Sequence, residues 1–198
     1  ILIQYQAPLF VALYTVALLR TKLPPAVFAA MAGSLFGCWL VVGGYNLDLL
    51  HMNRAGLLSA LASAVTFAWY TVRGEYGMKR YPPWTVVFYG LLFAAVTWNL
   101  LHPPLTGFLA PSGPAQWGSV LVVGFLGTVL AFICYNEGIK RIGATRASIT
   151  ATLEPITAGL IAWLFLGETM EVWQVLGAAL VVASIIGLQM SRKPSEQG

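Results

Sequence analysis

Residues 147–166 read ASITATLEPITAGLIAWLFL, a run of 20 residues in which Glu154 is the only charged side chain. A helix that crosses the hydrocarbon core of a bilayer needs about 20 mostly apolar residues. The run has that length, and its residues from 158 to 166 are all apolar. It therefore predicts a membrane-spanning helix with one carboxylate inside it.

The composition of the whole chain agrees with a lipid environment. Of its 198 residues, 58% are hydrophobic and only 9% are charged, whereas about a quarter of the residues in a soluble domain are charged. Such a chain lacks the polar surface to cover a soluble domain of this size. Together with the run above, further apolar stretches predict an all-α integral membrane protein with seven transmembrane helices, near 1–19, 24–44, 56–73, 84–101, 117–136, 147–166 and 171–189.

The basic residues predict the orientation of these helices. Ten of the 11 Lys and Arg residues fall in alternate connections, and Arg54 alone falls on the other side. Basic residues in short loops stay on the cytoplasmic side, so the C-terminus is predicted to be cytoplasmic in a multi-pass plasma or inner membrane protein. Because the charges are divided among separate loops, they predict no nucleic-acid partner. The ten are Arg20, Lys22, Arg73, Lys79, Arg80, Lys140, Arg141, Arg146, Arg192 and Lys193.

The first two spans and the last two share a pattern. Pro155 follows Pro8 by 147 residues, and each lies in an apolar helix. In both places a short turn and a second helix follow, and the second helix has small residues at a spacing of four. The charge rule makes the two pairs antiparallel, as in the inverted repeats of secondary transporters. We expect the small-residue faces to pack against neighbours in the bundle or against a second protomer in a homodimer. They are Gly33 and Gly37 in one helix and Ala179, Ala183 and Gly187 in the other.

Glu154 is the candidate functional residue. No basic residue lies within four positions of it, and Thr150 and Thr157 are at positions i−4 and i+3, on the same face of an α-helix. A charged carboxylate in hydrocarbon is costly, so such residues usually face a bundle interior or a water-filled cavity. The alternative is a structural role, in which Glu154 is protonated or reaches toward the cytoplasm and hydrogen-bonds a neighbouring helix.

Weaker candidates surround this residue. Pro8 and Pro155 each free a backbone carbonyl inside a span. Gln4, Gln6 and Tyr14 in the first span add polar groups for a solute, and Trp69 in the third would line an aromatic pocket. Interhelical hydrogen bonding is the alternative for the glutamines, and an interfacial aromatic belt is the alternative for Trp69. The sequence contains no HExxH, GxSxG or phosphate-loop motif, so we expect no enzyme, metal or cofactor.

The end of the chain resembles a known family. The last two spans are similar to the last two helices of EamA-type transporters of the drug/metabolite transporter superfamily. The similar residues are Leu153-Glu154-Pro155, then Leu166-Gly167-Glu168, then Gln174 and Gly177. The stretch IKRIGATRASITATLEPITAGLIAWLFLGE resembles the most recognisable run of that family, and YQAPLFVALYTVALL resembles its first-repeat counterpart. This chain has Ala7, not an acidic residue, before Pro8.

The resemblance implies a ten-helix bundle of two inverted five-helix repeats, of which this chain would be the C-terminal seven helices. Residues 1–44 would then end the first repeat, 45–55 would be an outer linker, 56–190 the complete second repeat and 191–198 a cytoplasmic tail. The implied function is alternating-access transport, as an exporter, of a small metabolite or drug-like solute, with a proton as a candidate coupling ion. A non-transporting membrane scaffold and an intramembrane enzyme are the alternatives.

Overall fold

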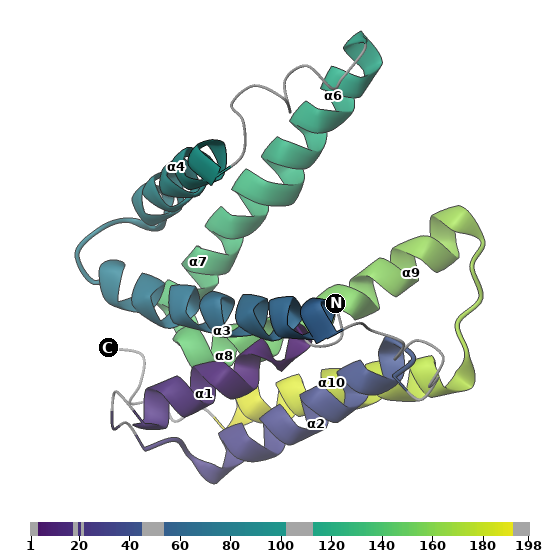
Figure 1. Ribbon diagram of the computed structural model, residues 1–198. Coiled ribbons are helices and arrows are strands. Elements are labelled where there is room, and N and C mark those ends of the chain that lie inside the picture. The colour runs from purple at the N-terminus through teal and green to yellow at the C-terminus, as the bar shows by residue number, and fades with distance from the viewer. Residues whose placement is uncertain (1–3, 18–19, 21, 45–53, 102–112, 192–198) are drawn as a thin grey trace. The chain divides into compact units, whose positions relative to one another are not determined.

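A computed structural model describes residues 4–17, 20, 22–44, 54–101 and 113–191, and every regular element in those ranges is helical (Figure 1). The elements are η1 (Gln4–Gln6), α1 (Ala7–Ala17), α2 (Pro25–Val41), α3 (Arg54–Gly77), α4 (Pro83–Leu101), α6 (Pro114–Val122), the π-helix η3 (Val123–Leu130), α7 (Ala131–Ile142), α8 (Ala144–Thr150), η4 (Ala151–Leu153), α9 (Glu154–Leu166) and α10 (Val172–Met190).

Prolines mark the beginnings of five of these helices. Pro25, Pro83 and Pro114 are the first residues of α2, α4 and α6, and Pro8 and Pro155 are the second residues of α1 and α9. Proline suits the first turn because its fixed φ is helical and the N–H it lacks would have no partner there. Helix ends are marked by glycine in the positive-φ region: Gly43 (φ 76°), Gly143 (φ 82°) and Gly167 (φ 69°).

The described helices match the predicted spans in position. Four stretches are long and apolar enough to cross a membrane: Pro83–Leu101, Pro114–Ile142, Ala144–Leu166 and Val172–Met190. The apolar helices Ala7–Ala17 and Pro25–Val41 are shorter, and α3 has 24 residues but is not among the four. The chain is therefore a helical membrane protein, while the count of seven spans remains a prediction.

Contacts divide the chain into two compact units, Ile1–Val72 with Ala144–Gly198, and Arg73–Gly143. Within the first unit, α2 lies beside α10 (Figure 1). A Cβ atom added to Gly33 would contact Ser184, whereas one added to Gly37 would lie 2.6 Å from the carbonyl oxygen of Gly177. Because the partner's number falls as the number on α2 rises, the two helices are antiparallel.

The face of α10 that contacts α2 differs from the one singled out above. Buried Gly177 and Val181 contact Gly37. Ala179, Ala183 and Gly187 are exposed, and a Cβ atom on Gly187 would meet nothing within 4 Å. Within the described chain, these three residues do not form the contact with α2, and their packing against another helix or a second protomer remains a prediction.

The second unit joins the end of α3 to α4 and to the continuous helix made by α6, η3 and α7. Gly74 of α3 allows close approach to Asn136, since a Cβ atom there would lie 3.3 Å from the Asn136 side-chain oxygen. Asn136 is fully buried. Helix α4 contacts α7, and the Arg141 guanidinium pairs with the Glu137 carboxylate at 2.9 Å, as their spacing of four predicts.

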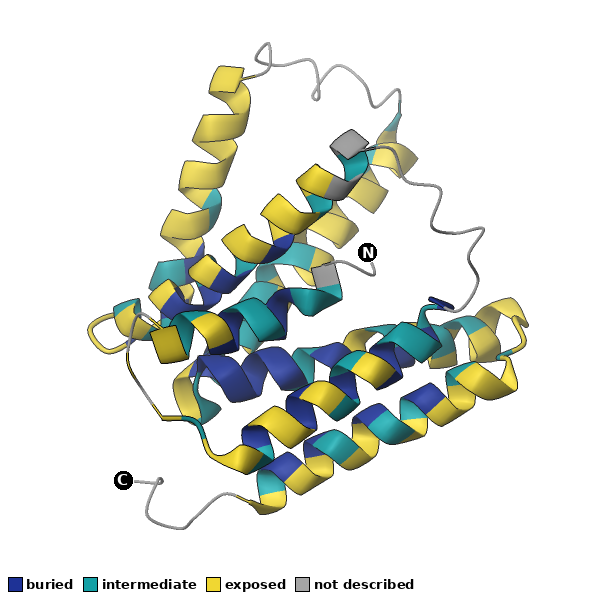
Figure 2. Cartoon of the chain, turned by 60° about the horizontal axis from the view of Figure 1, so that its bottom comes forward, coloured by how far each residue is buried: buried dark blue, intermediate teal, exposed yellow. Residues whose placement is uncertain are grey.

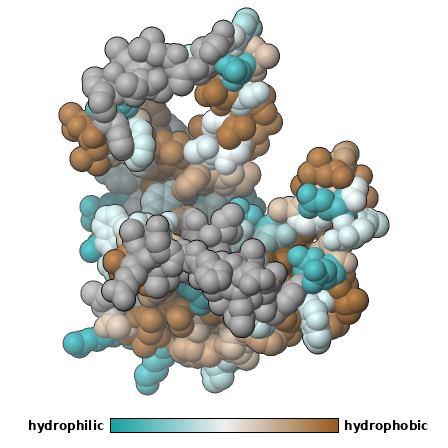
Figure 3. Space-filling model, turned by 45° about the vertical axis from the view of Figure 1, so that its right-hand side comes forward, coloured by the Kyte–Doolittle hydropathy of each residue, from teal (hydrophilic) through white to brown (hydrophobic). Residues whose placement is uncertain are grey.

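Large apolar side chains cover much of the surface. Leu100, Phe165 and Met190 are 80–81% exposed, and yellow exposed residues run along the long helices in Figure 2. Figure 3 shows brown apolar side chains on the face turned to the viewer. Large apolar side chains exposed in this number are stable in hydrocarbon rather than in water.

Candidate solute site

Glu154 lies at a break in a membrane-spanning helix. The stretch Ala144–Leu166 consists of α8, the 3₁₀ turn η4 and α9. Pro155 has no N–H to donate to the Ala151 carbonyl, and the N–H of Glu154 donates to that carbonyl instead. The 3₁₀ turn thus replaces the hydrogen bond that the proline removes, and it places Glu154 as the first residue of α9.

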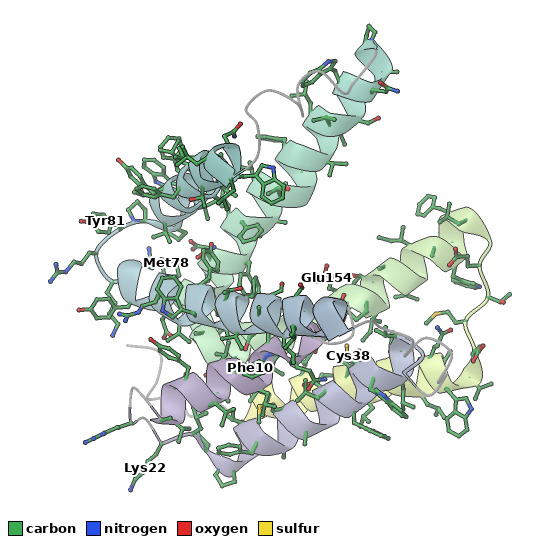
Figure 4. All side chains as sticks on the ribbon, in the orientation of Figure 1. Phe10, Lys22, Cys38, Met78, Tyr81 and Glu154 are labelled. Carbon is green, nitrogen blue, oxygen red and sulfur yellow. The ribbon has the colours of Figure 1, made fainter. Side chains whose placement is uncertain are left out.

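The Glu154 side chain is exposed. Among the residues that the structure describes, no ion pair or hydrogen bond to its carboxylate is present, in contrast to Glu137, which pairs with Arg141. Glu154 lies close enough to Tyr5 and Cys38 to interact with both electrostatically. In Figure 4 its side chain projects near the junction of α9 with the rest of the first unit.

The two threonines predicted beside Glu154 bond to their own helix. The Thr150 hydroxyl donates to the Arg146 carbonyl at 2.9 Å, and the Thr157 hydroxyl donates to the Glu154 carbonyl at 2.8 Å. Thr157 is exposed and Thr150 is half-buried. The tighter winding of η4 lies between Thr150 and Glu154, so the α-helical spacing that places these residues on one face applies between Glu154 and Thr157 only.

The first span has the same local structure. Turn η1 precedes α1 as η4 precedes α9, and Pro8 is the second residue of its helix, as Pro155 is. Gln6 and Tyr14 are half-buried and Pro8 is buried, while the side chain of Gln4 lies outside the described residues. The two spans thus share a 3₁₀ turn, a proline and a helix, although buried Ala7 stands at the position that Glu154 has in α9.

Not every candidate lies in this cluster. Trp69 of α3 is 54% exposed, and no contact that the structure describes joins it to Glu154. Tyr5 and Cys38 do interact electrostatically with Glu154, although neither was predicted to lie in the site. Cys38 is 1% exposed, within α2. No spacing rule relates residues 5, 38 and 154, because three separate helical elements bring them together.

The arrangement can bind a cation or a proton. It offers a carboxylate without a described counter-charge, within electrostatic range of a phenol and a thiol and at a break in a long apolar helix. Breaks of this type in membrane helices are found at substrate and ion sites of transporters. Groups of three or more His, Cys, Asp or Glu side chains that could hold a metal ion are absent from the described residues.

The fold and this site define a multi-pass helical membrane protein with a polar break inside a span. The model of the EamA-like transporter family matches residues 54–190. The chain belongs to this family, whose members are transporters and not enzymes.

Comparisons with individual proteins agree. An uncharacterized transporter of Archaeoglobus fulgidus is 27% identical over 185 residues, covering 93% of this chain and 64% of the relative. The threonine/homoserine exporter RhtA of Escherichia coli is 25% identical over 198 residues, covering 98% and 63%. A crystal structure has a TM-score of 0.77 at 21% identity and covers 98% of this chain and 66% of its own. The chain thus spans somewhat less than two thirds of the length of these proteins.

Proposed function

We propose that this chain is part of a secondary transporter that exports a small organic solute by alternating access, and that Glu154 binds either a cationic group of the solute or a coupling proton. The observation that carries this proposal is the exposed Glu154 carboxylate at the α8–η4–α9 break, without a described ion pair. A carboxylate inside a span is costly unless it faces a cavity or a partner. In a transporter, Glu154 would face water when the site is empty, and the solute or a proton when one is bound.

The repeated local structure supports alternating access. In both η1–α1 and η4–α9 a 3₁₀ turn precedes a helix whose second residue is proline, and the helices that follow them, α2 and α10, pack antiparallel. Two related halves of opposite orientation can exchange inward-open and outward-open states around a central site. We propose two inverted repeats, with 1–44 ending the first and 56–190 forming the second, and a cytoplasmic C-terminus in the cell membrane.

The relatives guide the choice of solute. RhtA is named as an exporter of threonine and homoserine, and proteins of Pseudomonas aeruginosa that are 24% identical to this chain are named as pseudopaline exporters. Amino acids carry an ammonium group, which a carboxylate binds by a charge-assisted hydrogen bond. Small solutes with an ammonium group are therefore the class to test first.

Glu154→Gln in proteoliposomes tests this function. The substitution keeps the size of the side chain and its hydrogen-bonding capacity but removes the charge. We expect efflux of labelled amino acids across a panel to fall, and its dependence on pH to flatten, while the melting temperature stays near that of the wild type. Glu168→Gln is the matched control, because Glu168 is an exposed glutamate in the turn after α9.

Two outcomes would count against the proposal. Wild-type efflux with an unchanged pH profile in Glu154→Gln would remove Glu154 from the transport path and favour a packing role. Solute that is chemically converted, as detected by mass spectrometry after incubation with the reconstituted protein, would favour an intramembrane enzyme instead.

A further inference from the structure

Helix α8 is buried along almost its whole length. Its six residues from Ala144 to Ile149 are all buried, and they give a continuous dark-blue stretch in Figure 2. It contacts α1, α2 and α10. The charge pattern predicts Arg146 in a cytoplasmic loop, but Arg146 lies within this helix and is 9% exposed. A buried arginine needs hydrogen-bond acceptors to offset the loss of water.

Side-chain hydrogen bonds join α8 to α10 and α1. The Arg146 guanidinium donates to the Leu188 carbonyl at 2.8 Å, and the hydroxyls of Thr145 and Thr15 are 3.4 Å apart. Leu188 is in the last turn of α10, where carbonyls lack backbone partners in the helix and the helix dipole is negative. Its carbonyl also accepts from the Ser191 hydroxyl at 2.8 Å. A guanidinium is well matched to this position, so the bond is charge-assisted.

Burial changes along the same span. The residues before Thr150 are buried, Thr150 is half-buried, and Glu154 and most of α9 are exposed. In the first unit, the Ala144 end of the span is therefore packed against α1, α2 and α10, whereas the residues that the structure describes leave Glu154 exposed. In an alternating-access cycle, the packed end would be the closed one.

We propose that Arg146 is the latch of the Ala144 end: its bond to the Leu188 carbonyl holds α8 against α10 and closes the route to Glu154 from that side. Arg146 is a positioning residue and does not contact the solute. This inference rests on the proposed function, since it takes Glu154 to line the path. Opening the Ala144 end requires the guanidinium to leave the Leu188 carbonyl.

Labelling of a cysteine at position 150 tests the latch without any solute. In a chain with Cys38 and Cys134 replaced by alanine, Thr150→Cys is exposed to a membrane-impermeant maleimide from each side in turn. We expect slow labelling from the Ala144 side, and an increase of about tenfold to a hundredfold in Arg146→Gln, the population shift that follows loss of a charge-assisted hydrogen bond. Arg141→Gln is the matched control, because Arg141 is exposed and pairs with Glu137.

The outcomes separate a latch from a purely structural arginine. A structural role would lower the melting temperature without changing which side labels position 150. If Arg146→Gln does not fold, Arg146→Lys decides the question: it keeps the charge but not the planar guanidinium, and we expect an intermediate rate from the Ala144 side. A folded Arg146 variant that labels at the wild-type rate, or an equal increase in Arg141→Gln, would overturn the proposal. Failed efflux in the Glu154 experiment would leave these labelling rates unchanged, so the two failures are distinguishable.

Discussion

Replacing Gly177 by alanine should force α2 and α10 apart. A Cβ atom on Gly177 would lie 2.6 Å from the Gly37 carbonyl oxygen, 2.7 Å from the Leu40 Cβ and 3.0 Å from the Val41 nitrogen. These atoms belong to the backbone or are attached directly to it, so no side chain can rotate to make room. The helices must separate, and overpacking of this kind costs about 1–3 kcal/mol of the free energy of unfolding.

Gly187→Ala is the matched control on the same helix. A Cβ atom at Gly187 would meet nothing within 4 Å, so the change relieves the conformational cost of a helical glycine, which is roughly 0.5–1 kcal/mol. The two substitutions add the same methyl group to α10 and are expected to change stability in opposite directions.

Titration of the purified chain from mild detergent into SDS, followed by tryptophan fluorescence, measures both effects. We expect Gly177→Ala to unfold at lower SDS and Gly187→Ala at equal or higher SDS than the wild type. The close packing of α2 on α10 would be refuted by a Gly177→Ala chain at least as stable as the wild type.

Three further outcomes are expected. Gln174→Leu should destabilise the chain by about 1 kcal/mol in the same titration, because Gln174 donates to the Val41 carbonyl at 3.2 Å and accepts from the Glu171 N–H at the start of α10. Unchanged stability would contradict a stabilising role for these two hydrogen bonds. Pro155→Ala should slow efflux, since it restores a helical N–H and removes the break; unchanged efflux would argue against a role for the break. Reporter fusions after Arg80 should report cytoplasm and those at Arg54 the outside, and reversal of both would invert the proposed topology.

The positions of the helices are predictable from this sequence because spanning helices need long apolar runs and prolines mark their first turns. The apolar run at 84–101 and Pro83 predict almost all of α4, which begins at Pro83 and ends at Leu101. The break before Pro155 is likewise predictable, since proline cannot donate the helical hydrogen bond. The 3₁₀ turn that repairs the break is a finding of the structure.

Contacts between helices are less predictable. Helix α10 has small residues on two faces, and spacing alone does not say that Gly177, rather than Ala183, meets α2. Arg146 shows the same limit, because a charged residue beside a turn-forming glycine has the pattern of a loop. Its burial depends on a carbonyl at Leu188, 42 residues away, and no local pattern encodes that partner.

The two proline breaks share one backbone design but hold only one carboxylate, because Ala7 stands where the second would be. Under the proposed function, a proton and the ammonium group of a solute therefore compete for the same oxygen atoms. A single carboxylate accepts one proton or one monovalent cation at a time, so at this site the binding of one excludes the other. Under that proposal, a solute that binds Glu154 through its ammonium group must displace a proton at low pH, and its apparent affinity falls as the pH is lowered.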